Sequence, residues 1–122
     1  MIDTEFYGFD PEQKIHLLRP NYNKNINYDI DLIDHISFYS KVANKLELDG
    51  FLEELENELD VYLYWGDDYV FDIDYCLKFK NYLIKKLNRT DLDPDLVDIY
   101  TQMLNITNKA IELNSGLYID FF

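Results

Sequence analysis

The sequence predicts an α+β protein: three main helices packed with a small antiparallel sheet drawn from the N-terminal segment, a central hairpin and the C-terminal strand. Segments with apolar residues at spacings of three and four alternate with short runs of β-branched and aromatic residues. The chain also begins and ends with strand-like segments. Its 122 residues are close to the usual size of one domain, so we expect residues 1–122 to form a single compact domain.

The N-terminal third is predicted to contain a strand, a loop and a long helix. Residues 2–9 mix β-branched and aromatic side chains and end at a turn, which predicts a strand. Residues 12–19 are expected to form one or two helical turns, and four asparagines within residues 21–27 predict a loop. Apolar residues then recur on one face from residue 29 to 46, which predicts the first long helix.

A glutamate-rich helix is expected next. Phe51, Leu52, Leu55 and Leu59 recur at intervals of three and four, so they would form the buried stripe of this helix. The other face consists of glutamates, with no lysine four residues further on to pair with them. We therefore expect an exposed acidic helix face.

A hairpin and a further helix are expected in the middle of the chain. Residues 61–65 and 69–71 have strand-like character on either side of Gly66, which predicts a β-hairpin whose turn uses the conformational freedom of that glycine. A helix over residues 73–88 follows, with an acidic start and a basic end, as the helix dipole favours.

The last helix has recognisable ends. Asp93 is predicted to be its N-cap and Pro94 its first helical residue. Gly116 is expected to close its C-terminal end. Residues 117–122 then predict a terminal strand.

The negative charge of the chain is concentrated in one stretch. Residues 46–77 contain no lysine or arginine and hold eleven of the 24 carboxylates. Seven acids and five bases precede this stretch, and six of each follow it, although the net charge of the whole chain is −13. Nonspecific nucleic-acid binding and docking on an anionic membrane both require cations, so the charge argues against both. It favours a protein partner with a basic surface.

Large aromatic residues are interleaved with these carboxylates. Aromatic side chains supply contact area at interfaces, and a field of one sign steers an oppositely charged partner. The residues predicted to bind the partner are Glu54, Glu58, Tyr62, Tyr64, Trp65, Asp67, Asp68, Tyr69 and Asp72. A solvated acidic helix face combined with aromatic core residues would have the same pattern, and the sequence leaves both interpretations open.

The sequence predicts no catalytic residue, metal or cofactor. It contains no phosphate-binding glycine loop, no nucleophile motif and no pair of ligands at zinc spacing. Asp31 and His35 lie four residues apart on the expected first helix, where a surface hydrogen bond is the simplest role, and His16 has no evident companion. Cys76 falls on the apolar stripe of its helix and is expected in the core.

Three features predict the location of the protein. A single cysteine cannot form an internal disulfide, the N-terminus is acidic where a signal peptide would be basic, and no apolar run is long enough to cross a membrane. We therefore expect a cytoplasmic protein.

Three segments resemble a known class of proteins. They are Trp65–Asp68, Ile73–Cys76 and the ending from Ala110 to Phe121, and they span about the second half of the chain. These segments look like those of small bacterial immunity proteins, which neutralise polymorphic or contact-dependent toxins. The resemblance implies a cytoplasmic protein that binds one cognate toxin tightly and has no catalytic activity. It assigns no role to a single residue, because the toxin-contacting residues of such proteins are not fixed.

The expected function is therefore inhibition of a basic partner, with the immunity protein of a bacterial toxin, such as a nuclease, as the first interpretation. A phage-encoded inhibitor of a nucleic-acid-guided nuclease would share the acidity and the small size. A non-catalytic regulatory module that homodimerises through its aromatic surface is another alternative. The least favoured is a small metal-dependent enzyme, with Asp67, Asp68, Asp72 and Asp74 around a divalent ion.

Overall fold

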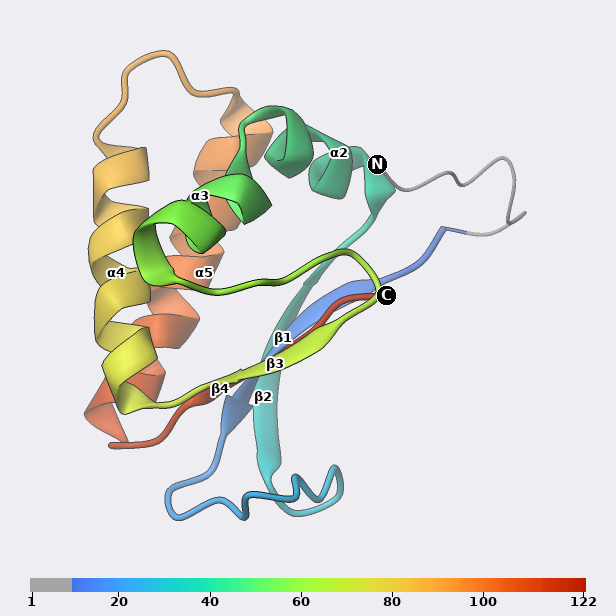
Figure 1. Ribbon diagram of the computed structural model, residues 1–122, viewed down its shortest axis with the longest axis vertical. Coiled ribbons are helices and arrows are strands. Elements are labelled where there is room, and N and C mark those ends of the chain that lie inside the picture. Colours follow the sequence, from blue (N-terminus) through green and yellow to red (C-terminus); the bar gives the residue numbers. More distant parts are fainter. Residues whose placement is uncertain (1–9) are drawn as a thin grey trace.

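The computed structural model describes residues 10–122 and confirms the α+β class. The predicted strand over residues 2–9 lies outside the described residues. In chain order the elements are β1 (Gln13–Leu18), β2 (Leu32–Phe38), α2 (Ser40–Leu48), α3 (Phe51–Leu59), β3 (Asp68–Phe71), α4 (Ile73–Leu87), α5 (Pro94–Glu112) and β4 (Leu117–Asp120). The described part of the chain thus has four helices, where three main ones were expected, and four strands (Figure 1).

The strands form one antiparallel sheet in the order β2-β1-β4-β3. β1 lies inside the sheet, where Ile15 is opposite Ile36 of β2 and Ile119 of β4. Ile15 belongs to the core, and the next residue, His16, points to the other face of the sheet. The expected helical turns over residues 12–19 are therefore wrong. This run is a strand because it pairs with segments that are distant in the sequence, and local spacing does not report such pairing.

The predicted helix over residues 29–46 is wrong in its first half. The structure has the edge strand β2 there, followed by α2, which begins at Ser40. The spacing of Ile30, Ile33 and Ile36 imitates a helical stripe, yet Ile30 and Ile33 are both exposed. β-branched residues suit a strand, and pairing with β1 outweighs the local spacing.

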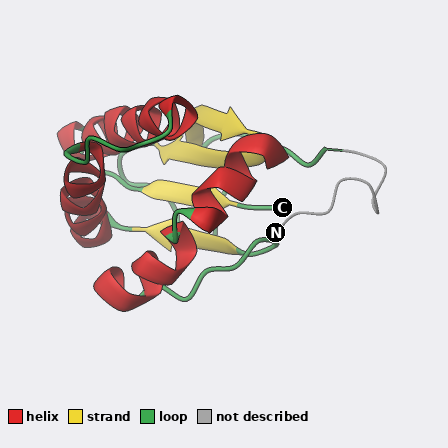
Figure 2. Ribbon diagram, turned by 90° about the horizontal axis from the view of Figure 1, so that it is seen from above, coloured by secondary structure: helices red, strands yellow, loops and turns green. Residues whose placement is uncertain are grey.

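The helices lie to one side of the sheet, as Figures 1 and 2 show from two directions. α5 packs along β1 and β2 and against α4, and α3 packs against α2 and α4. Among the fully buried side chains between these layers are Phe51, Phe71, Phe79 and Tyr100. Burial of such a side chain contributes roughly 1.5–3 kcal/mol. Part of the aromatic content of the chain therefore forms the core.

The predicted hairpin does not form. β3 is a strand, but it pairs with β4 and not with residues 61–65. Residues 61–65 instead cross the front of the molecule in Figure 1 and diverge from β3. The turn between them uses Gly66 as expected, because that residue has a φ of 103°. The residues around Gly66 were therefore sufficient to predict the turn, whereas they could not show which strand pairs with β3.

α4 and α5 confirm the two helices predicted in the second half of the chain. Asp93 caps α5 with its side chain, and Pro94 is the first helical residue. The predicted role of Gly116 is wrong, because the residue in the left-handed conformation after α5 is Asn114, with a φ of 50°. Gly116 permits a close approach instead, since a Cβ there would collide with the carbonyl oxygen of Phe71.

Candidate functional site

The fold divides the carboxylates of the acidic stretch into two groups, and α3 shows the division most clearly. Its glutamates lie on two flanks of the buried stripe. Glu54 and Glu58, four residues apart, lie on the flank that faces α4. Glu53 and Glu56, three residues apart, lie on the flank that faces residues 61–65. The two flanks have different surroundings and therefore different chemistry.

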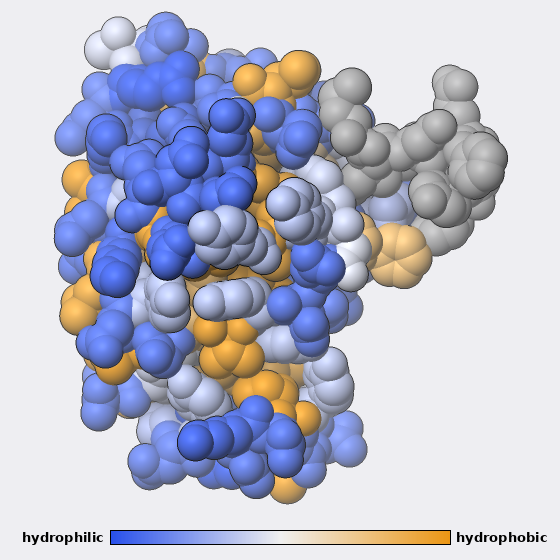
Figure 3. Space-filling view, in the orientation of Figure 1, coloured by the Kyte–Doolittle hydropathy of each residue, from blue (hydrophilic) through white to orange (hydrophobic). Residues whose placement is uncertain are grey.

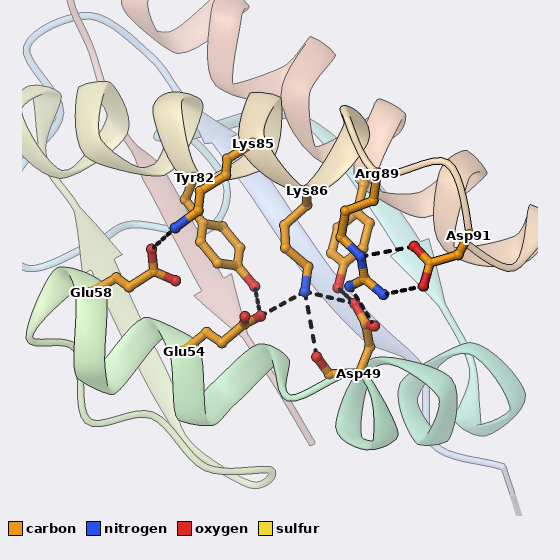
Figure 4. A network of polar contacts seen from close by, with 9 residues as sticks. Asp49, Glu54, Glu58, Tyr82, Lys85, Lys86, Arg89 and Asp91 are labelled. Atoms are coloured by element: carbon orange, nitrogen blue, oxygen red, sulfur yellow. Dashed lines mark hydrogen bonds and ion pairs between the residues drawn. The ribbon is translucent and has the colours of Figure 1, made fainter.

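A polar network joins the α2–α3 turn and α3 to α4 (Figure 4). Its centre is Lys86, whose side chain is only 5% exposed and whose Nζ lies 2.9 Å from Asp49 Oδ2 and 2.7 Å from Glu54 Oε1. The Tyr82 hydroxyl donates to the same oxygen of Glu54 at 2.9 Å. A buried ammonium group is costly unless it is paired, so these contacts are what allow Lys86 to be buried.

Asp49 is the second centre of this network. Its Oδ1 accepts a hydrogen bond from Arg89 Nη1 at 2.9 Å, and its Oδ2 accepts one from the Tyr100 hydroxyl at 2.7 Å. Burial by itself would raise the pKa of Asp49, but the hydrogen bonds from Lys86, Tyr100 and Arg89 outweigh burial and lower that pKa. Asp49 therefore ties the α2–α3 turn to α4 and α5.

Two of the predicted partner-binding residues, Glu54 and Glu58, are engaged with α4. Glu54 belongs to the network, and Glu58 pairs with Lys85, whose Nζ lies 3.0 Å from Glu58 Oε1. α3 itself has no lysine, but α4 supplies these two from 27 and 32 residues further along the chain. The acidic face expected to lack basic partners is therefore paired on this flank.

Three other predicted partner-binding residues lie at the two ends of β3 and are exposed: Asp67, Asp68 and Asp72. Asp67 accepts the backbone N–H of Tyr64 at 3.1 Å, and Asp68 accepts the Tyr118 hydroxyl at 2.7 Å. Asp72 is the N-cap of α4. Each of these carboxylates thus stabilises a turn, a strand pair or a helix end.

A hollow of about 440 Å³ opens between α2, α3 and residues 61–65. We call it the acidic hollow, and it is lined by Glu47, Leu52, Glu53, Glu56, Leu63, Tyr64 and Trp65. Figure 3 shows paler and hydrophobic surface in this central region, below the strongly hydrophilic surface over α2 and α3. The lining of the acidic hollow therefore combines apolar and aromatic side chains with three carboxylates.

Trp65 forms one wall of the acidic hollow. Its indole Nε1 donates to Glu47 Oε2 at 3.0 Å. Its ring packs against Phe121 and Phe38, with ring centroids 4.9 and 6.4 Å away. The indole is thus held at its polar edge and by its aromatic contacts, and a fixed indole beside carboxylates suits a cationic side chain.

Glu53 and Glu56 differ from the other two glutamates of the same helix. Within residues 10–122, neither carboxylate takes part in a hydrogen bond or an ion pair. Beside them, the side chains of Tyr62 and Tyr64 are each 61% exposed. The negative charge of Asp60 raises the pKa of the Tyr62 hydroxyl, which keeps that side chain neutral. Available carboxylates and exposed tyrosines therefore meet at this part of the surface.

Tyr69, also predicted to bind the partner, is placed differently. It is half-buried and packs edge-on against Phe71 and Tyr75, with ring centroids 5.7 and 6.0 Å away. It therefore belongs to the packing around β3 and not to the exposed aromatic pair.

Three acidic residues of the hollow were not among the predicted binding residues: Glu47, Glu53 and Glu56. The helical spacing already placed Glu53 and Glu56 off the buried stripe. The sequence could not show which flank α4 covers, because α4 lies far along the chain. Nor could it show that residues 61–65 would leave the sheet and open a hollow beside α3.

A titratable cluster on the other face of the sheet was also missed. His16 stacks on Tyr118 and faces His35 across the strand pair, with ring centroids 5.8 and 5.7 Å away. Its Nε2 is buried, has no hydrogen-bond partner within residues 10–122 and lies 3.8 Å from Asp120 Oδ2. Burial lowers the pKa of His16, which favours the neutral imidazole. His16 thus has companions that only the sheet register reveals.

The predicted pair of Asp31 and His35 does not form. Asp31 Oδ1 accepts a hydrogen bond from Arg19 Nε at 2.6 Å, and Asp31 Oδ2 accepts the backbone N–H of Asn27 at 2.7 Å. The helix that would have brought Asp31 and His35 together is the strand β2. Asp31 therefore holds the loop between β1 and β2.

Cys76 is buried in the core, as expected. Burial raises the pKa of its thiol to about 12, so the thiolate form that would act as a nucleophile is suppressed at physiological pH. Among residues 10–122, no group of three or more histidine, cysteine, aspartate or glutamate side chains is arranged to hold a metal ion. No helix in the same range is long and apolar enough to cross a membrane.

Comparisons with known protein families, curated proteins and solved structures found no match for this chain. Its function is therefore inferred from its own sequence, geometry and charge.

Proposed function

We propose that this protein is an inhibitor that binds and neutralises a protein with a basic surface, and that it is the immunity protein of a bacterial toxin. A nuclease is the favoured class of toxin, because carboxylates can occupy the cationic surface on which such an enzyme holds phosphates. The acidic hollow carries the proposal. Glu53 and Glu56 have no partner among the described residues, and Tyr62 and Tyr64 stand exposed beside them.

The two kinds of side chain would contribute differently to binding. The glutamates steer a basic partner and accelerate association, an effect that salt screens. The tyrosines supply contact area at a low cost in side-chain entropy and therefore carry much of the affinity. Glu53 and Glu56 give up no hydrogen bond or ion pair with residues 10–122 on binding, whereas Glu54 would have to leave Lys86. The flank that faces the hollow is therefore the better one for binding.

The proposal is tested by affinity capture from the cell's lysate and from the secretions of neighbouring cells, at low and high salt. A captured basic protein is identified by mass spectrometry, and its activity is then measured with and without the inhibitor. Tyr62→Ala with Tyr64→Ala should weaken its binding by about tenfold or more. Val97→Ala, at a position on α5 that is 42% exposed, is the matched control and should leave binding unchanged. Capture of no basic protein, or of one whose activity stays intact, would contradict the proposed function.

The identity of the captured protein separates the alternatives. A nucleic-acid-guided nuclease would support a phage-encoded inhibitor. Recovery of the chain alone, with the mass of a stable dimer in light scattering, would support a homodimerising module.

A further inference from the structure

Residues 61–64 have the alternation of a β-strand but pair with no strand of residues 10–122. Val61 and Leu63 are buried, whereas Tyr62 and Tyr64 are exposed. Figure 1 shows the segment drawn out between α3 and β3. Since β3 pairs with β4, an extended piece of main chain runs along the wall of the acidic hollow without belonging to the sheet.

The alternation of the segment indicates the side to which the main-chain groups of Leu63 point. Consecutive residues of an extended segment direct their N–H and C=O groups to opposite sides. The main-chain groups of Tyr64 point to one side of the segment and take part in the turn. Its N–H donates to the Asp67 side chain and its C=O accepts the Asp67 N–H, each at 3.1 Å. On the other side, the Val61 N–H donates to the carbonyl oxygen of Leu55 in α3 at 3.2 Å. Leu63 shares the side of Val61, so the alternation directs its two groups toward α3, and Leu63 is one of the residues that line the hollow between α3 and this segment.

These two groups of Leu63 make no hydrogen bond within residues 10–122, although the residue is only 3% exposed. Buried backbone N–H and C=O groups of proteins are almost always paired. A second chain that lies antiparallel beside Leu63 would pair both groups at once, as in peptide recognition by strand addition. The unpaired groups therefore indicate an extended polypeptide as the ligand.

The carboxylates around the hollow determine which side chains that polypeptide should carry. Glu53 and Glu56 line the same hollow without an internal partner among the described residues, and the indole of Trp65 forms its wall. Arginine fits this combination better than lysine, because its planar guanidinium both stacks on an aromatic ring and donates several hydrogen bonds to carboxylates.

We propose that the acidic hollow binds a short extended segment of a basic partner, which pairs its main chain with Leu63 and places an arginine between Glu53 and Glu56. The inference rests on the proposed function for the class of partner. It adds the manner of binding: strand addition through the main chain, combined with recognition of a cation through the side chains.

Titration of the ¹⁵N-labelled protein with the peptide acetyl-Val-Arg-Val-Arg-Val-amide, followed through the amide NMR signals, tests this inference. The amide of Leu63 should shift strongly, because its N–H gains a carbonyl partner. Replacement of both arginines by citrulline keeps the shape, removes the charge and should weaken binding at least about tenfold. Methylation of the central amide nitrogen removes a main-chain donor and should weaken binding to a similar extent.

The protein variants provide the matched comparison. Glu53→Gln with Glu56→Gln should weaken binding of the arginine peptide at least about tenfold, while Glu112→Gln, an exposed glutamate of α5, should leave it unchanged. An unshifted Leu63 amide at about 10 mM peptide, or equal binding of the arginine and citrulline peptides, would overturn the inference. The proposed function would survive that result if a captured toxin still loses affinity with Tyr62→Ala and Tyr64→Ala. Conversely, peptide binding without any captured toxin would leave the site standing and remove the proposed function.

Discussion

The two flanks of α3 carry the same type of residue and have different roles. Glu54 is held by Lys86 and Tyr82, whereas Glu53, one position earlier, lies on the rim of the acidic hollow without a partner among residues 10–122. One residue turns an α-helix by about 100°, so neighbours in the sequence meet different surroundings. An acidic run is therefore not one surface, because part of it stabilises the fold and part remains available for binding.

The largest expected effect comes from removal of the central cation of the network. Lys86→Met leaves Asp49 and Glu54 without that cation in a partly buried site and should lower the free energy of unfolding by about 3–5 kcal/mol. Lys85→Met removes a lysine whose side chain is 74% exposed and should cost at most about 1 kcal/mol. Urea unfolding measures both. Equal costs would show that the network is no more than a set of surface pairs.

A second comparison uses the two adjacent glutamates. Glu54→Gln weakens hydrogen bonds to a charged group and should lower the free energy of unfolding by about 2 kcal/mol. Glu53→Gln should stay within about 0.5 kcal/mol of the wild type. For binding of a basic partner the order should be reversed, so that Glu53→Gln weakens binding more than Glu54→Gln does. If denaturant unfolding gave both variants the same cost, the distinction between the two flanks would fail.

Acid should act on the network through Asp49. The pKa of the Asp49 carboxyl is lower in the folded protein than in the unfolded chain, where it is about 3.9. The contribution of Asp49 to stability is therefore fully present above about pH 3.9. It is lost as the pH falls through the lower pKa of the folded protein. Asp49→Asn should therefore be less stable than the wild type at pH 7, by about 1–2 kcal/mol. That difference should shrink between about pH 4 and pH 2. Unfolding curves in which it stays constant across this range would rule out the ionised carboxylate as the cause.

The smallest expected effect lies on the flank that faces the hollow. Glu53→Gln with Glu56→Gln relieves repulsion between like charges three residues apart and should raise the free energy of unfolding by a few tenths of a kcal/mol. Glu58→Gln, which gives up the pair with Lys85, should not raise it. Thermal unfolding at low salt measures the stability of the double variant and of Glu58→Gln and distinguishes their effects. A clear loss of stability in the double variant would mean that these glutamates have a structural role.

Local pattern was sufficient for three helices and insufficient for the sheet. α3, α4 and α5 follow apolar spacings of three and four, and Asp93 marks the start of α5 as predicted. β1 and β2 were assigned to helices because their pairing joins residues that no short window contains, such as His16 with His35 and with Tyr118. Residues 61–65 were assigned to a hairpin because local spacing cannot show that β4 takes the place beside β3.

The sequence and the structure point to the same region for the candidate site but to different residues within it. The charge and aromatic pattern pointed to residues 46–77, and Tyr62, Tyr64 and Trp65 do lie at the hollow or beside it. From the sequence pattern, Glu54 was predicted to bind the partner and Glu53 was not, because the sequence does not show which flank of α3 the helix α4 covers.

By itself, the sequence determined where the helices of the second half run, where the negative charge gathers and that Cys76 is buried. These features depend on helical spacing, on composition and on hydrophobicity, which act over a few residues. Only the tertiary structure decided which carboxylates are paired. The cation that binds Glu54 comes from 32 residues further along the chain, and the one that binds Asp49 at Oδ1 comes from 40. The packing of α3 and α5 around α4 brings these groups together, and no interaction within a short segment specifies that packing.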